Sequence, residues 1–188
     1  MFGKQSGAEA VKSQRGRSNA VYFFPYEKIM TNWTGVPLNE AHNFQVRKLE
    51  ISDKSKGFVE LLQQLTVCDA ISDENFEARF QELRSLGDDH VICVIEDTTC
   101  GKIIATGSVF IEKKFVRNCG KAGHIEDVVV DRDSRGMQLG KKVLSFLADH
   151  AQSVGCYKVI LDCSNENKAF YEKCGFKQKE IQMVKYFI

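Results

Sequence analysis

Two arginines, two glycines and a serine lie in the stretch DRDSRGMQLGKK, which runs from Asp131 to Lys142. The stretch follows the apolar run DVVV and precedes KKVLSFLADHA, whose apolar spacing predicts a helix. A strand-to-helix joint exposes backbone N–H groups that have no partner within the helix. Those groups and the helix dipole attract an anion, by about 0.3–1 kcal/mol for the dipole at an exposed site. The stretch therefore predicts a pyrophosphate-binding loop, in which Arg135 and Lys141 add positive charge.

The two glycines of this loop, Gly136 and Gly140, would let the backbone and a ligand come close together. The spacing is not that of a Walker loop, G-x-x-x-x-G-K-[ST], nor that of the dinucleotide fingerprint G-x-G-x-x-G. Taken alone, the stretch is equally consistent with an ordinary capped helix whose basic residues are solvated. A second group of residues is needed to decide between these interpretations.

The elements that would position the loop follow from the apolar periodicity. A loosely alternating run predicts a first strand, and Phe58, Leu61, Leu62 and Leu65 at helical spacing predict a first helix. Ser72 and Gly87 are typical of the start and end of a second helix. The remaining pattern predicts strands over residues 90–97, 102–112 and 124–130, a helix over 136–155, a strand over 157–163, a helix over 165–175 and a last strand over 181–188. This order predicts an α+β fold, with a mixed, largely antiparallel sheet flanked by helices.

Length and composition limit the remaining possibilities. The 188 residues suit one domain, expected over residues 44–188, after a polar extension over residues 1–43 that is expected to be disordered or packed on the surface. A net charge of +1 gives no reason to expect nucleic acid, and no apolar run reaches the roughly 20 residues of a membrane span. Seven cysteines without C-x-x-C spacing predict reduced thiols in the cytoplasm and no metal site.

The second group of residues is the stretch NENKAFYEKCGF, about thirty residues after the loop. Together with that loop it resembles the GNAT superfamily of acetyl-CoA-dependent N-acetyltransferases. The superfamily loop reads [QR]-x-x-G-x-[GA], and here it reads Arg135-Gly136-Met137-Gln138-Leu139-Gly140. Gln138 replaces the first glycine of that pattern, so its side chain must turn away from the pyrophosphate or bind it.

Further motifs, in order LLQQLT, IATGSVFIEKKF, GHIEDVVV, CYKVILDC and FYEKCGF, are similar to the glucosamine 6-phosphate N-acetyltransferase family of animals and fungi. The resemblance covers the chain from Phe44 to its end. It implies direct transfer of acetyl from acetyl-CoA to the amine of D-glucosamine 6-phosphate, without a covalent acyl-enzyme, for UDP-N-acetylglucosamine synthesis. It also implies a homodimer whose subunits share their active sites.

The same resemblance implies where acetyl-CoA would bind. The cleft would lie where the strand over residues 122–130 splays from the strand over residues 157–163, and the pantetheine arm would pair with the main chain of Glu126, Asp127 and Val128. Tyr171 would point at the sulfur and stabilise or protonate the departing thiolate. Asn167 would orient the cofactor, or would only cap the helix of Tyr171. The pyrophosphate would bind Ser134, Arg135, Gly136, Met137, Gln138, Leu139, Gly140 and Lys141.

On the acceptor side, the amine of an aminosugar should have a pKa of about 8, like an α-amino group, so a strong base is not required. Glu126 and Asp162, one on each splayed strand, are the candidate carboxylates that hold sugar hydroxyls or the ammonium and relay its proton. The alternative is that they are merely solvated acids at strand ends.

The phosphate of the sugar needs cations, and here the sequence departs from the family. An arginine in the last strand serves the phosphate in the family, whereas this chain ends MVKYFI, with Lys185 and Tyr186. This departure leaves open a GNAT enzyme for another small amine, and Gln138 leaves open a catalytically weak acyl-CoA-binding module. The other candidate substrate-binding residues are Thr66, Glu112, Lys113, Lys114 and His124.

Overall fold

A computed structural model describes residues 43–187, so the expected extension over residues 1–43 lies almost wholly outside the described residues, as does Ile188. The strands are β1 (Phe44–Lys48), β2 (His90–Asp97), β3 (Lys102–Lys113), β4 (Lys121–Val130) and β5 (Cys156–Ile160). The α-helices are α1 (Phe58–Leu62), α2 (Asp73–Ser85), α3 (Val116–Cys119), α4 (Leu139–Ser153) and α5 (Asn165–Lys173). Short 3-10 helices are η1 (Ile51–Lys56), η2 (Gly87–Asp89) and η3 (Arg132–Ser134).

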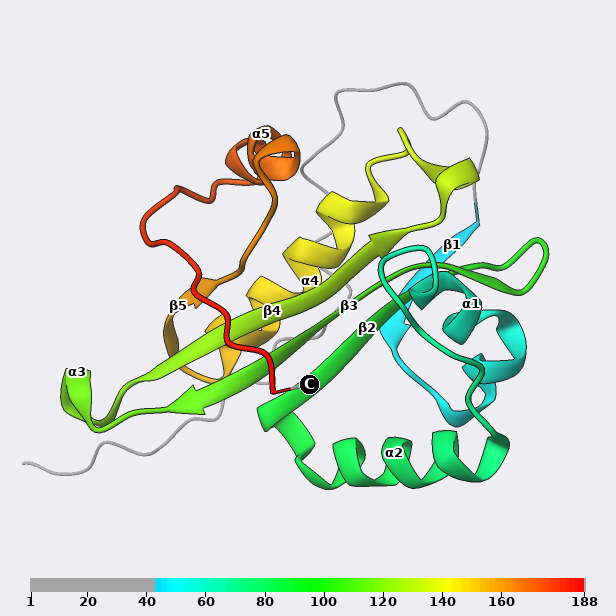
Figure 1. Cartoon of the computed structure of the whole chain (residues 1–188), viewed down its shortest axis with the longest axis horizontal. Coiled ribbons are helices and arrows are strands. Elements are labelled where there is room, and N and C mark those ends of the chain that lie inside the picture. The colour runs from blue at the N-terminus through cyan, green and yellow to red at the C-terminus, as the bar shows by residue number, and fades with distance from the viewer. Residues whose placement is uncertain (1–42, 188) are drawn as a thin grey trace, which may run out of the picture. The chain divides into compact units, whose positions relative to one another are not determined.

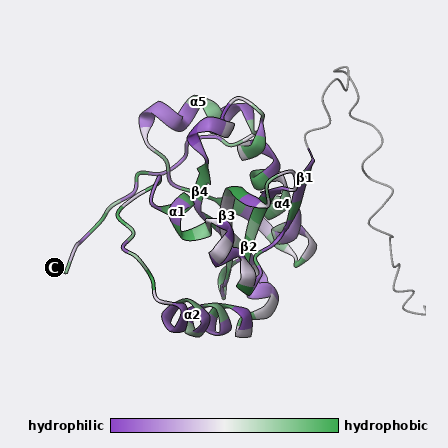
Figure 2. Cartoon of the chain, turned by 90° about the vertical axis from the view of Figure 1, so that its right-hand side faces the viewer, coloured by the Kyte–Doolittle hydropathy of each residue, from purple (hydrophilic) through white to green (hydrophobic). Residues whose placement is uncertain are grey.

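The five strands form one sheet in the order β1-β2-β3-β4-β5 (Figure 1). Neighbours from β1 to β4 are antiparallel, and β4 and β5 are parallel. Helix α4 lies on one side of the sheet, and α1 and α2 lie on the other (Figure 2). The predicted α+β class with a mixed sheet is confirmed.

Two apolar clusters explain this layering. The apolar stripe of α4 is fully buried against side chains of β2, β3 and β4, and it consists of Leu139, Val143, Leu147 and Ala151. On the other face Phe58 and Leu61 of α1 and Phe76 of α2 pack against Val94, Ile103 and Val129. Because successive strand residues point to opposite faces, β2 and β3 supply both clusters and are buried on both sides.

A group of charged side chains is buried beside β1. The guanidinium of Arg47 contacts Asp53 Oδ1 at 2.6 Å and Glu96 Oε2 at 2.5 Å, and Lys56 Nζ lies 2.9 Å from Glu96 Oε1. Asp53 is completely buried and also accepts a hydrogen bond from the backbone N–H of Glu50. The Asp53 side chain thus caps η1 and joins it to β1.

The predicted splay between the two parallel strands is confirmed. β4 pairs with β5 only from Lys121 to His124, opposite residues 156–160, so residues 125–130 of β4 have no partner in β5. β5 ends at Ile160, three residues earlier than the sequence predicted, and the chain then diverges toward α5 (Figure 1). This divergence leaves one edge of β4 without strand pairing.

A β-bulge sits in the unpaired part of β4. Thr106 pairs with Val129 and Ser108 pairs with Glu126, so Asp127 and Val128 stand opposite the single residue Gly107. Asp127 adopts a positive φ of 53°. Bulges disrupt the ladder and bend the strand, so this one adds to the opening of the sheet.

Gly107 has no room for a side chain. A β-carbon there would lie 2.8 Å from Val143 Cγ1 of α4 and 3.2 Å from Val128 Cγ2. We expect Gly107→Ala to lower the free energy of unfolding by about 1–3 kcal/mol, because a well-packed core resists added volume. Urea unfolding measures this loss. The double variant Gly107→Ala with Val143→Ala should lose less free energy of unfolding than the sum of the two single losses, because the smaller side chain makes room for the new methyl group. Strict additivity would show that Val143 is not the side chain that resists this methyl group.

Three predicted elements differ in the structure. The last strand is wrong, because residues 181–187 pair with no strand of the described chain, and a strand needs a neighbour to pair its backbone. The first helix ends at Leu62, and the backbone then turns with i to i+3 hydrogen bonds at Gln64 and Leu65. Helix α4 begins at Leu139 instead of near Gly136, because Gly136 and Gln138 have positive φ values of 85° and 58°, which a right-handed helix excludes.

Candidate active site

The predicted pyrophosphate loop connects β4 to α4 through a short 3-10 turn. A β-carbon at Gly136 would meet nothing within 4 Å, so glycine is required there by its φ and not by crowding. Gln138 precedes α4 in the left-handed conformation. A side chain in that conformation costs roughly 1–2 kcal/mol, which explains why the GNAT pattern has glycine at this position. The first N–H groups of α4 follow directly, as the anion-site prediction requires.

Gly140 joins this loop to the next helix. It is buried in the first turn of α4, and a β-carbon there would lie 3.0 Å from Phe170 Cζ and 3.6 Å from Val130 Cγ2. The glycine therefore lets α4 approach α5, which carries Tyr171. The sequence interpretation assigned Gly140 to ligand approach, and the structure adds helix packing.

Tyr171 is half-buried on α5, edge-on to two phenylalanines. Ring centroids are 5.0 Å from Phe170 and 6.1 Å from Phe176. Burial raises the pKa of Tyr171, and the Cys163 and Cys174 thiols raise it further. The phenol is therefore protonated at neutral pH and has a proton to donate.

Ser164, not Asn167, occupies the N-cap position of α5. Asn167 lies within the first turn, where its backbone N–H donates to the carbonyl of Ser164, and its side chain is exposed. The capping interpretation of Asn167 is wrong, because the chain bends into the helix three residues earlier. Its proposed role toward the cofactor stays a prediction.

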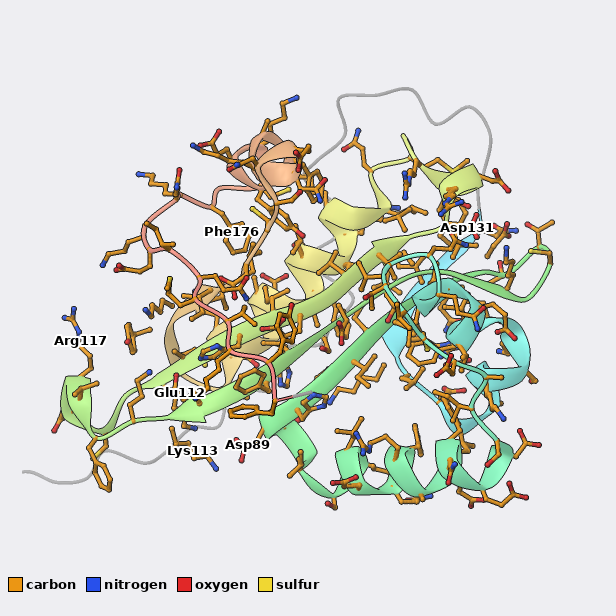
Figure 3. All side chains as sticks on the ribbon, viewed as in Figure 1. Asp89, Glu112, Lys113, Arg117, Asp131 and Phe176 are labelled. Atoms are coloured by element: carbon orange, nitrogen blue, oxygen red, sulfur yellow. The ribbon has the colours of Figure 1, made fainter. Side chains whose placement is uncertain are left out.

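A cavity of about 640 Å³ lies between the end of β5, α5 and the C-terminal segment. Tyr171, Asp162 and Cys163 line it, together with Phe176, which Figure 3 labels next to α5. Asp162 Oδ2 accepts a hydrogen bond from Gln182 Nε2 at 2.8 Å. The structure thus brings together two of the three predicted catalytic residues.

Glu126, the third, lies on β4 outside the lining of this cavity. Burial raises the pKa of Glu126, and the negative charges of Asp127 and Asp162 raise it further. The two predicted carboxylates are therefore close enough to repel each other across the gap between the splayed strands. Such a pair holds a cation readily, because a positive charge relieves the repulsion.

The raised pKa of Glu126 implies a stability cost that a substitution can remove. At low pH, Glu126 is protonated in the folded and unfolded states and costs no stability. As pH rises through its raised pKa, the carboxylate must form in the folded state, and the free energy of unfolding falls. We expect Glu126→Gln to increase the free energy of unfolding at pH 7 and to leave it unchanged near pH 3. Denaturation at both pH values tests this, with Glu77→Gln on the exposed side of α2 as the control. An equal gain at both pH values would contradict the electrostatic cause.

A further polar cluster lies toward the far end of β3 and β4. Glu112 Oε2 lies 2.8 Å from His124 Nε2 and 2.5 Å from Lys114 Nζ, and the His124 ring stacks on Phe110 at a centroid distance of 4.4 Å. Lys113 is not part of this cluster, because it pairs with Asp89 at 2.5 Å. Figure 3 shows Glu112, Lys113 and Asp89 at the opposite end of the sheet from Asp131.

Two predicted substrate-binding residues stand apart from these clusters. Thr66 is exposed in the turn that follows α1. Lys185 lies in the C-terminal segment, where its Nζ sits 5.6 Å from the ring centroid of Phe187. Sequence reasoning missed Phe110 and Gln182. A lone aromatic in a strand and a glutamine in a tail carry no local signal of the contacts they make.

Comparison with known proteins decides the family. The model of the family described as "Acetyltransferase (GNAT) family" matches residues 56–176, which run from the end of η1 to the turn after α5. The chain belongs to the GNAT acetyltransferase family.

Individual GNAT relatives are close in sequence and structure. The glucosamine 6-phosphate N-acetyltransferase of Arabidopsis thaliana is 72% identical over 147 residues, which are 78% of this chain and 99% of that protein. Glucosamine 6-phosphate N-acetyltransferase 1 of Oryza sativa subsp. japonica is 49% identical over 148 residues, covering 79% and 90%. The crystal structure of the Arabidopsis thaliana enzyme superposes with a TM-score of 0.76 and covers 77% of this chain and 99% of that one.

No helix over residues 43–187 has the length and apolar character to cross a membrane. The same residues hold no group of three or more His, Cys, Asp and Glu side chains placed to bind a metal ion.

Proposed function

We propose that this GNAT enzyme transfers the acetyl group of acetyl-CoA to the amine of D-glucosamine 6-phosphate, giving N-acetyl-D-glucosamine 6-phosphate and CoA. The observation that carries this proposal is the unpaired edge of β4 beside the cavity of Tyr171 and Asp162. The relatives that are 72% and 49% identical, named for this reaction, support the choice of acceptor.

The donor would be held mainly by main-chain groups. The free edge of β4 at Glu126, Asp127 and Val128 offers backbone donors and acceptors to the pantetheine arm, in the manner of an added strand. The loop from Ser134 to Lys141 offers N–H groups at the start of α4 to the pyrophosphate. Gly136 leaves open space beside that backbone.

The chemical step follows from the groups around the cavity. The amine nitrogen attacks the thioester carbonyl, and the C–S bond breaks as the acetyl group moves to nitrogen. Tyr171 donates its proton to the departing thiolate, and the phenolate then regains a proton from solvent. Glu126 and Asp162 hold the positive charge that develops on nitrogen, and its proton leaves through them. Because the amine has a pKa of about 8, the enzyme mainly needs to position it.

We propose that the sugar phosphate binds between the gap that separates β4 from β5 and the cluster of Glu112, Lys114 and His124. Lys114 and His124 are cationic candidates for the sugar phosphate, and Thr66 is a candidate for a hydroxyl. Lys113 is the weakest of the predicted cations, because it is already paired with Asp89. Lys185 would serve from the C-terminal segment of a second subunit.

The test is thiol release from acetyl-CoA in the presence of one amine at a time. Turnover is expected with glucosamine 6-phosphate and is expected to fall by at least about 100-fold with glucosamine, because the ion pairs with the phosphate are lost. Equal turnover with glucosamine or another small amine would overturn the acceptor. CoA binding without turnover of any amine would overturn the assignment of an enzymatic activity and would favour an acyl-CoA-binding module.

We further propose a homodimer in which the C-terminal segment packs on a second subunit. Figure 2 shows the end of the chain extending away from the helices and strands. Its large apolar residues Ile181, Met183 and Phe187 are 84%, 87% and 90% exposed. Light scattering should give twice the chain mass of 21.3 kDa, and Ile181→Asp with Met183→Asp should return the monomer. A monomeric wild type would reject the dimer.

We also propose that the protein works in the cytoplasm. All seven cysteines lie among the described residues and all are free thiols, which suits the reducing cytoplasm. There the product would enter the synthesis of UDP-N-acetylglucosamine. Fractionation of cells that express the full chain would locate the protein.

A further inference from the structure

Asp131, the first residue of the stretch DRDSRGMQLGKK, is the point from which the pyrophosphate loop is held. It is only 4% exposed. Its backbone N–H donates to the carbonyl of Ile104 at 2.8 Å, and its carbonyl accepts from the N–H of Ser134 at 3.0 Å. Its Oδ1 accepts from the N–H of Asp133 at 3.1 Å, and its Oδ2 accepts from Lys102 Nζ at 3.0 Å. These bonds fix the turn that leads into Arg135.

Gln64 contacts this turn with both ends of its side-chain amide. Its Nε2 donates to Asp131 Oδ2 at 3.0 Å, and its Oε1 accepts from the backbone N–H of Arg132 at 3.0 Å. Two bonds from one planar amide fix both the position and the orientation of the turn. Gln64 follows α1, on a part of the chain that is 67 residues away from Asp131.

The loop beyond this turn has little other support. Arg135, Gly136 and Met137 are exposed, and the next buried residue is Leu139 at the start of α4. The loop is therefore held at two ends, by α4 on one side and by the Asp131 turn on the other. Since small displacements of positioned groups weaken binding steeply, the second support matters for any ligand on the loop.

We propose that Gln64 is a positioning residue for the pyrophosphate loop, acting through Asp131 and Arg132 to hold the loop amides ready for the pyrophosphate of acetyl-CoA. This inference rests on the proposed function for its ligand. Both side-chain hydrogen bonds of Gln64 go to the turn, so its effect should appear with ligands that reach the loop.

The experiment compares Gln64→Met, which keeps the length and removes both polar ends, with Gln63→Met on the exposed neighbour. We expect Gln64→Met to raise the KM for acetyl-CoA and the calorimetric Kd for CoA by about tenfold, the value of a hydrogen bond to a charged group. The kcat should stay within about twofold, because no reacting group changes. Gln63→Met should match the wild type in all three quantities.

An acetyl donor without the pyrophosphate can distinguish a misplaced loop from a general defect in the fold. S-acetylpantetheine carries the thioester arm without the pyrophosphate, so its kcat/KM should be the same for Gln64→Met and wild type. Equal losses with both donors would overturn the proposal in favour of a fold defect, and so would an unchanged Kd for CoA. Gln64→Glu provides a second variant. It keeps an oxygen that can accept from the N–H of Arg132, but it places a negative charge next to Asp131. We expect it to weaken CoA binding at least as much as Gln64→Met does.

The calorimetric Kd for CoA also separates a failure of the Gln64 proposal from a failure of the proposed function. If wild type binds CoA but acetylates no aminosugar, the acceptor assignment fails while the comparison of CoA affinities still tests Gln64. If wild type does not bind CoA, the proposed function fails first, and the assignment of a pyrophosphate to this loop fails with it.

Discussion

Replacing Tyr171 with phenylalanine should lower kcat by at least about 100-fold, the usual contribution of a positioned general acid. Tyr171 lines the cavity that Asp162 also lines, and its raised pKa keeps the phenol protonated, as the proposed donation to the thiolate requires. Phenylalanine preserves the edge-on contacts with Phe170 and Phe176, so the fold and the cavity should remain. Initial rates by thiol release measure kcat, and calorimetry with CoA should show a Kd within about twofold of wild type.

Tyr157→Phe is the matched control for this prediction. Tyr157 lies on β5 at 45% exposure, under the cationic groups of Arg117 and Lys158, and outside the cavity lining. Its loss should leave kcat unchanged. If Tyr171→Phe also kept its full kcat, the phenol would have no part in the chemistry, and a matching rise in the Kd for CoA would make it a binding residue instead.

Replacing Asp53 with alanine should lower the free energy of unfolding at pH 7 by about 3–5 kcal/mol, because removal of one partner leaves buried charge without compensation. Asp53 is completely buried, and Arg47 is only 13% exposed at its side chain. Glu96 remains next to Arg47, so the lower end of this range is expected. Urea denaturation provides the measurement. Glu82→Ala, in the exposed pair with Arg79, should cost less than about 1 kcal/mol.

The same cluster predicts how stability depends on pH. Burial opposes the charge of Asp53, but hydrogen bonds from Arg47 and from the N–H of Glu50 lower its pKa, and hydrogen bonds from Lys56 and Arg47 lower the pKa of Glu96. A lowered carboxyl pKa contributes stability that is present above about pH 4 and is lost as pH falls through the folded-state value. Wild type should therefore lose stability in acid more steeply than Asp53→Ala. Parallel curves would contradict this origin.

Much of the fold could be predicted because local patterns coincide with it. The apolar stripe of α4 has helical spacing and is buried as expected, and Ser72 caps α2 by accepting a hydrogen bond from the backbone N–H of Asn75. The splay of β4 from β5 came from the family resemblance, not from spacing. The loop between β4 and α4 could also be located in the sequence, because its glycines and basic residues follow a strand and precede a helix. Its binding of a pyrophosphate stays a prediction.

Other features depend on contacts that no local pattern encodes. The bulge at Asp127 has no marker in β4 itself, and Gly107 on the neighbouring strand becomes informative only once Val143 is seen beside it. Gln64 and Asp131 are distant in the sequence, and each alone reads as an ordinary polar residue. The alternating residues near Met183 predicted a strand, but alternation does not say whether a neighbour is available within the same chain.

The short ladder between β4 and β5 has a dynamic consequence. Among residues 43–187, β5 is joined to the rest of the sheet only by its pairing with Lys121–His124 of β4, and β5 leads directly into α5. We expect backbone amides of β5 and α5 to exchange with deuterium faster than those of β2 and β3, which are paired on both sides. The gap between β4 and β5 thus leaves β5 and α5 with less strand pairing than the centre of the sheet, and the proposed donor would slow that exchange by bridging the strands.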